Sequence, residues 1–204
     1  MPKPISMPKP RCDPTMRHRP RPRTRFVSKR LLLPVIILIA GLLMSRLQPR
    51  YPALAPSDLP YGTFSGKVVG VADGDTIDVL YKNAEVKVRL FGVDCPEKDQ
   101  AYGSRATRFT SDMVFGETVN VDVRDHDRYG RVVAWVTSPD GKSLNEELVR
   151  AGMAWWYEHY DPDDTRLSKL QDEARNAARG LWADKNPMPP WDFRKVERNA
   201  RGVP

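Results

Sequence analysis

Three short segments with alternating apolar and polar residues lie between residues 63 and 93, separated by tight turns. Phe64–Val71, Thr76–Tyr81 and Val86–Val93 are each predicted to form a β-strand, because alternation with a period of two presents one face to a core. Lys82-Asn83 predicts a hairpin turn between the second and third strands. The sequence therefore predicts three consecutive strands in a domain that begins near Tyr61.

The next hundred residues add helices and two more strands. Ala101–Phe115 predicts a helix, and Thr118–Val123 and Arg131–Thr137 predict strands. The capping box Ser143-x-x-Glu146 opens a second helix, and Thr165–Arg179 predicts a third. Five strands with a helix after the third predict an α+β fold, a five-stranded OB-type β-barrel with three helices.

Positive charge is concentrated at the N-terminus. Residues 1–50 hold 12 of the 33 Lys and Arg residues but only one of the 26 Asp and Glu residues, so the rest of the chain is acidic overall. The basic balance is therefore not the footprint of a nucleic-acid-binding face on the domain. If the domain binds nucleic acid, it does so at a local site where a metal ion supplies part of the positive charge.

An apolar run of 14 uncharged residues, LLLPVIILIAGLLM, follows the basic arm at residues 31–44. A transmembrane helix needs roughly 17–25 residues. The run reaches that length if it extends to Leu47, with the Arg46 side chain reaching toward the headgroups. We favour an uncleaved signal anchor with a cytoplasmic N-terminus, because ten Lys and Arg residues precede the run and two follow it. A cleaved signal peptide and a buried soluble helix are the alternatives.

The basic arm is interpreted as a charged flank of the anchor, with a nucleic-acid-binding arm as the alternative. Cys12 and Cys95 lie on opposite sides of the apolar run, so no disulfide and no zinc site is expected. The predicted organisation is a disordered cytoplasmic tail at 1–30, a transmembrane anchor at 31–48, a Pro-rich linker at 49–61, a folded domain at 62–185 and an irregular C-terminal tail at 186–204.

Acidic residues and arginines gather around the predicted strand ends. Asp73, Asp75, Asp94 and Glu97 offer oxygens for a hard cation, and arginines in a strand and in the turn DRYGR at 127–131 offer forked donors for a phosphate. This combination indicates phosphodiester chemistry. Each piece also has a structural interpretation: Asp-Gly is a hairpin signal, an arginine in a strand pairs with a neighbouring acid, and DCPE is typical of a helix-entry turn.

The order of these motifs resembles the thermonuclease family, whose members have the staphylococcal-nuclease-like fold. The matching pieces are DGDT at 73–76, RL at 89–90, VDCPE at 93–97, DRYGR at 127–131 and LVRAG at 148–152, within residues 62–185.

The resemblance implies roles for particular residues. Asp75, Asp94 and the backbone carbonyl of Cys95 would ligate Ca²⁺, and Glu97 would orient or deprotonate the attacking water. The remaining assigned residues are the phosphate-binding Arg89 and Arg131 and the substrate-binding Arg128, Tyr129 and Tyr160.

The sequence thus predicts a monomeric, membrane-tethered, extracytoplasmic nuclease that depends on Ca²⁺. The resemblance implies that it cleaves DNA and RNA with little base preference and leaves 3′-phosphates. The alternative is a non-catalytic module of the same fold that binds nucleic acid or protein at the membrane. Such a module would be expected to lose Arg89, Glu97 or Arg131, and all three are present.

Overall fold

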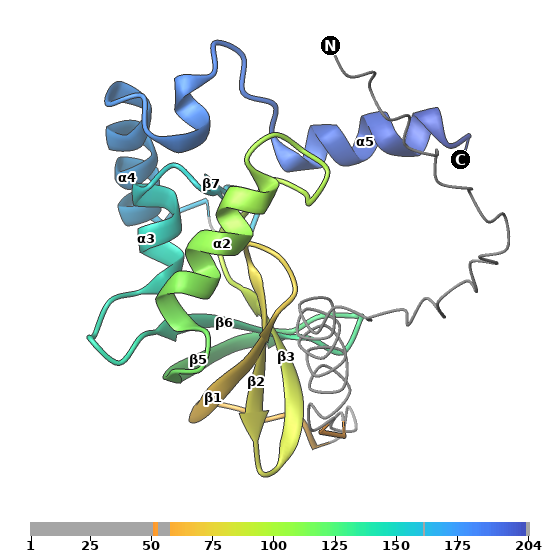
Figure 1. Ribbon diagram of the computed structural model, residues 1–204, viewed down its shortest axis with the longest axis vertical. Coiled ribbons are helices and arrows are strands. Elements are labelled where there is room, and N and C mark those ends of the chain that lie inside the picture. Colours follow the sequence, from red (N-terminus) through yellow and green to blue (C-terminus); the bar gives the residue numbers. More distant parts are fainter. Residues whose placement is uncertain (1–50, 53–57, 161, 203–204) are drawn as a thin grey trace, which may run out of the picture. The chain divides into compact units, whose positions relative to one another are not determined.

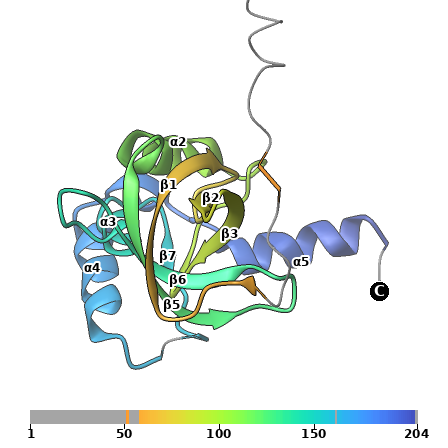
Figure 2. The same cartoon turned by 90° about the horizontal axis from the view of Figure 1, so that it is seen from below.

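The computed structural model describes residues 51–52, 58–160 and 162–202. Its centre is a closed five-stranded barrel in the order β1-β2-β3-β6-β5 (Figures 1 and 2). The strands are β1 (Thr63–Val71), β2 (Thr76–Tyr81), β3 (Ala84–Leu90), β5 (Thr118–His126) and β6 (Val132–Thr137). The five predicted strands and the barrel are confirmed.

Alternation along the strands builds the barrel. In β3, Val86, Val88 and Leu90 face the interior, and the residues between them, including Arg89, face outward. The β2–β3 turn at Lys82 and Asn83 has both residues at positive φ, as a tight hairpin turn with the right twist requires. This hairpin was predicted from the sequence.

The β3 strand also closes the barrel through a parallel pairing with β6. Arg89 pairs in register with Val133, while the other neighbouring strands of the barrel pair antiparallel. Arg131 lies two residues before Val133, so the period of two places it on the same outward face as Arg89. The closure of the barrel thus sets the two predicted phosphate-binding arginines on one face.

The predicted third strand is interrupted. It was expected to run to Val93, but β3 ends at Leu90 and the chain turns at Gly92, where φ is +71°. Val93 and Asp94 then form β4, which pairs antiparallel with β7 (Trp155–Trp156) in a separate two-stranded sheet. The break turns Asp94 out of the barrel and toward the helices.

Three helices pack beside the barrel: α2 (Gly103–Val114), α3 (Leu144–Arg150) and α4 (Thr165–Asn176) (Figure 1). Ser143 caps α3 by accepting a hydrogen bond from the Glu146 amide, as the capping box predicted. The helix α4 ends three residues earlier than expected, because the chain turns through positive φ at Ala178. Leu144, Leu148 and Leu167 are fully buried and join the helices to the core.

The side-chain amide of Asn145 ties the helical layer to the barrel. Its Oδ1 accepts from the Val136 amide at 3.0 Å, and its Nδ2 donates to the carbonyls of Phe91 at 2.9 Å and Ala134 at 3.3 Å. Asn145 is fully buried, and its bonds to Val136 and Ala134 are buried as well, where little water competes for them. Asn145 therefore fixes the turn at which β3 gives way to β4.

The region after residue 186 is not an irregular tail. It contains α5 (Pro190–Ala200), preceded by the 3₁₀ helix η2 (Gly180–Ala183). Proline favours the first turn of a helix, and Pro190 is the first residue of α5, directly after the cap residue Pro189. Trp191 anchors the helix by stacking on Tyr157 at 5.3 Å and packing edge-on against Trp155 at 5.6 Å. Trp155, Tyr157 and Trp191 thus form one packed aromatic cluster.

The predicted anchor at 31–48 and the basic tail at 1–30 lie outside the described residues. Within the described parts of the chain, none of the helices is both long enough and apolar enough to cross a membrane. Two points of the predicted linker touch the barrel domain: Leu59, near its end, is buried, and the carbonyl of Pro52, near its start, accepts a hydrogen bond from the Glu85 amide at 2.8 Å.

Candidate active site

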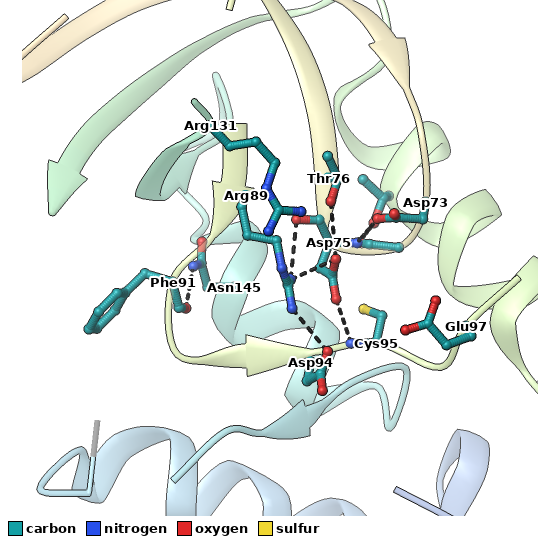
Figure 3. Close-up of polar contacts among 12 residues, drawn as sticks. Asp73, Asp75, Thr76, Arg89, Phe91, Asp94, Cys95, Glu97, Arg131 and Asn145 are labelled. Atoms are coloured by element: carbon teal, nitrogen blue, oxygen red, sulfur yellow. Dashed lines mark hydrogen bonds and ion pairs between the residues drawn. The ribbon is translucent and has the colours of Figure 1, made fainter. Parts of the chain in front are cut away.

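Arg89 joins the two predicted cation-binding carboxylates. Its Nη1 lies 2.6 Å from Asp75 Oδ1, and its Nη2 lies 2.9 Å from Asp94 Oδ1 (Figure 3). Asp75 stands just before β2, Arg89 is in β3 and Asp94 is in β4, so three successive elements each deliver one charged group. All three side chains are largely buried, and Asp94 is only 1% exposed.

Hydrogen bonds from Cys95 and Thr76 also fix the Asp75 side chain. Its Oδ2 accepts from the Cys95 amide at 2.6 Å, and its Oδ1 accepts from the Thr76 hydroxyl at 3.3 Å. Gly74 makes this approach possible, because a Cβ on it would lie 2.7 Å from that of Cys95 and 2.8 Å from that of Ala106. The glycine of the DGDT motif is therefore required by close packing of the turn.

Burial and charge set the protonation states of the groups around Asp75 and Asp94. Burial, followed by the charge of Asp75, raises the pKa of Asp73 to about 6. Burial alone would lower the pKa of Arg89, but the charges of Asp75 and Asp94 raise it above its ordinary value. Burial and then Asp75 raise the pKa of the Cys95 thiol well above its usual range, so this cysteine stays a neutral thiol.

Glu97 follows β4 and is more exposed than the aspartates. Its Oε1 accepts from Arg194 Nη1 at 2.7 Å, and Gln100 holds its backbone through a 3.1 Å bond to the Glu97 amide. Gly103 packs directly on this turn, since a Cβ there would meet the Glu97 carbonyl group. The turn thus presents the Glu97 carboxylate beside Asp94.

Arg194, which no motif in the sequence indicated, is a third arginine in the site. It reaches from α5 to both oxygens of Asp94, with Nη2 2.7 Å from Oδ2 and Nη1 3.2 Å from Oδ1. Burial alone would lower its pKa, but hydrogen bonds to Asp94 and Glu97 raise it above its ordinary value.

Arg131 is held by its own turn. Its Nε donates to Asp127 Oδ2 at 2.6 Å, and Asp127 Oδ1 accepts from the backbone amides of Tyr129 and Arg131, both at 2.9 Å. Burial alone would raise the pKa of Asp127, but these hydrogen bonds from Arg131 and Tyr129 lower it. Asp127 is therefore an ionised positioning group for Arg131, a role that its place in the turn motif did not indicate.

The three predicted substrate-binding residues lie at the surface. Arg128 Nη2 donates to the Tyr129 hydroxyl at 2.8 Å, and its guanidinium stacks 4.9 Å from that ring. Tyr160 is exposed and packs on Tyr157 at 5.0 Å. In the part of the chain that the structure covers, neither Tyr129 nor Tyr160 hydrogen-bonds to the buried carboxylates.

Comparison with known proteins places this geometry in a family. The sequence profile described as "Staphylococcal nuclease homologue" matches residues 87–184. An Escherichia coli protein described as "Uncharacterized endonuclease" is 48% identical over 129 residues, which cover 63% of this chain and 84% of that protein. The chain belongs to the staphylococcal nuclease family. The resemblance seen in the motifs is thereby confirmed.

Other members of the staphylococcal nuclease family show the same relationship. The "Micrococcal nuclease" of Shigella flexneri is 40% identical over 149 residues, covering 69% of this chain and 86% of that protein. The "Staphylococcal-like nuclease CAN1" of Arabidopsis thaliana is 38% identical over 125 residues, covering 59% of this chain and 38% of that longer protein.

The donor atoms in the site fit a calcium ion, which the family resemblance implies. Asp75, Asp94 and the Cys95 carbonyl offer only oxygen, the ligand that Ca²⁺ prefers. Among residues 51–52, 58–160 and 162–202, no three His, Cys, Asp or Glu side chains group so as to hold a metal ion unaided. Two carboxylates and a carbonyl therefore need water or a substrate phosphate to complete a shell of six to eight oxygens.

Proposed function

We propose that this protein is a Ca²⁺-dependent endonuclease that hydrolyses phosphodiester bonds of DNA and RNA. The observation that carries the proposal is the bridge of Asp75 and Asp94 by Arg89, with Glu97 beside it. Relatives described as an endonuclease and a micrococcal nuclease support this activity. The alternative is a non-catalytic binding module of the same fold.

The charged side chains take separate roles in this proposal. The forked donors of Arg89 and Arg131 bind the phosphoryl oxygens and strengthen those bonds as negative charge develops. Glu97 accepts a proton from the attacking water, whose oxygen forms a new bond to phosphorus as the bond from phosphorus to the 5′ oxygen breaks. The 5′ oxygen takes up a proton from solvent and leaves as a 5′-hydroxyl, and the other product end keeps a 3′-phosphate. A calcium ion held by Asp75, Asp94 and the Cys95 carbonyl would supply Lewis acidity at the phosphate.

Low base preference follows from which substrate groups the site would contact. Contacts to phosphate carry no sequence information, and aromatic rings stack on any base. Arg128, Tyr129 and Tyr160 stand at the surface, where they would hold the sugar-phosphate chain and a base on either side of the reacting phosphate.

Replacing Glu97 with glutamine tests the activity and its site. Without a base for the water, we expect cleavage of single- and double-stranded DNA to slow by about 10²–10⁴-fold. The rate is measured with the purified protein in Ca²⁺ and in chelator, and product ends are tested for 3′-phosphates. Glu117→Gln, at an exposed glutamate before β5, is the matched control. Nucleic acid bound but never cut by the wild type would favour the binding module.

We further propose that residues 31–48 anchor a monomeric protein in a bacterial-type membrane, with the nuclease domain outside the cytoplasm. The support is the apolar run at 31–44 and the ten basic residues before it. In a bacterial host, we expect the full chain to stay in the membrane pellet after alkaline extraction. We also expect a protease added to intact spheroplasts to digest the nuclease domain. A shorter, soluble product would instead show that the segment is a cleaved signal.

A further inference from the structure

Arg194 comes from the opposite end of the chain, and a fixed helix delivers it to the site. Its helix α5 is rooted by Trp191 in the aromatic cluster and, just upstream, by a 2.6 Å bond from Gln100 Nε2 to the Met188 carbonyl. The Gln100 side chain also bonds the Glu97 amide. The same turn thus positions Glu97 and ties down the segment that carries Arg194.

The guanidinium of Arg194 engages the carboxylate that a calcium ion needs. One fork covers both oxygens of Asp94, and Oδ1 also accepts from Arg89. A carboxylate offers about four lone-pair sites, so three of those on Asp94 are filled by arginine donors. A cation that joins Asp75 to Asp94 must take an oxygen that Arg194 now holds.

Electrostatic repulsion also sets the cation and the Arg194 guanidinium in competition for Asp94. The single positive charge of Arg194 is shared between Asp94 and Glu97, with contacts of 2.7 Å to each. A doubly charged ion on Asp94 would stand within a few ångströms of this guanidinium, where like charges repel strongly in a partly buried site. The ion and the Arg194–Asp94 pair therefore disfavour each other.

We propose that Arg194 is a tethered competitor of the catalytic cation: it occupies Asp94 and Glu97 while the site is empty and leaves Asp94 when the cation binds. Because the same Nη1 of Arg194 donates to Asp94 Oδ1 and to Glu97 Oε1, its withdrawal from Asp94 also frees the Glu97 carboxylate to take a proton from water. This inference rests on the proposed function, because the cation is the Ca²⁺ of that proposal. Arg194 thus sets the cation concentration at which the nuclease becomes active.

Calorimetric titration of Ca²⁺ into the full chain tests the competition without measuring cleavage. We expect Arg194→Gln to bind Ca²⁺ about tenfold more tightly than the wild type, since one charged hydrogen-bonded partner no longer has to be displaced. Arg194→Lys keeps the charge but loses the fork, so its affinity should fall between the two. Arg198→Gln removes the same charge from an exposed position one turn further along α5 and should match the wild type.

Other outcomes separate this inference from the proposed function. Equal or weaker Ca²⁺ binding by both Arg194 variants would overturn the competition, even if the protein cleaves DNA. Tighter binding by Arg194→Gln and none by Asp75→Asn, without cleavage by the wild type, would keep the competition and reject the nuclease. An equal gain in Arg198→Gln would reduce the effect to net charge and overturn the direct role of Arg194. Absence of Ca²⁺ binding in every variant would overturn both proposals.

Discussion

Replacing Arg89 with glutamine is expected to slow cleavage by about 10³–10⁵-fold, the range for an arginine that stabilises a phosphoryl group in transfer. The same change should lower the free energy of unfolding by about 3–5 kcal/mol in the absence of added cation. The reason is that Arg89 is shared: it spans Asp75 and Asp94, and both carboxylates are buried. Cleavage assays and urea unfolding in chelator measure the two effects.

Two variants test whether cleavage and stability depend on the forked guanidinium of Arg89 or only on its positive charge. Arg89→Lys keeps a positive charge, but one ammonium cannot reproduce the paired geometry, so stability should recover more than activity. Arg124→Gln breaks an exposed pair with Asp122 and should change the free energy of unfolding by less than about 1 kcal/mol. An Arg89→Gln protein as stable as the wild type would show that the bridge does not hold the two carboxylates in the fold.

Replacing Gly152 with alanine is expected to lower the free energy of unfolding by about 2–6 kcal/mol, from backbone strain and overpacking together. Gly152 has a φ of +66°, and an added Cβ would lie 2.8 Å from the Arg179 carbonyl carbon and closer still to its oxygen. Its own carbonyl accepts from the Leu181 amide at 2.8 Å, so the neighbouring backbone cannot retreat without losing that bond. Thermal and urea unfolding measure the loss.

Gly141 provides the control for this prediction. It has a φ of +82°, but nothing lies within 4 Å of where its Cβ would be. Gly141→Ala should therefore lower the free energy of unfolding only through backbone strain at positive φ, by about 1–2 kcal/mol. If Gly152→Ala costs no more than Gly141→Ala, close packing of Gly152 on Arg179 is not what requires the glycine.

Local signals in the sequence were sufficient for the barrel and for the carboxylates. Apolar alternation predicted the five strands, and Lys82-Asn83 predicted a turn whose residues do adopt positive φ. Asp75, Arg89 and Asp94 could be grouped because they fall within 20 residues, at the ends of strands that pair with one another or turn at Gly92. Short-range pairing therefore places Asp75 beside Arg89, whereas Asp94 also depends on the pairing of β4 with the distant β7.

Contacts between distant residues could not be predicted in this way. Arg194 lies 100 residues from Asp94, in a C-terminal segment that was predicted to be irregular and that contains a helix. Asn145 had no visible signal, because its role depends on three backbone groups brought together only by the fold. The arginine at 131 was predicted, but its partner Asp127 appeared only as part of a turn.

The parallel pairing of β3 with β6 has a consequence for folding. The β1–β2–β3 meander assembles from neighbours in the chain, so the Asp75–Arg89 pair can form early and locally. Arg131 joins that face only when β6 docks on β3 after a loop of some forty residues has closed, a slow, non-local step. A partly folded chain would therefore hold the Asp75–Arg89 pair without Arg131, and the two arginines come together on one face in the same step that seals the barrel.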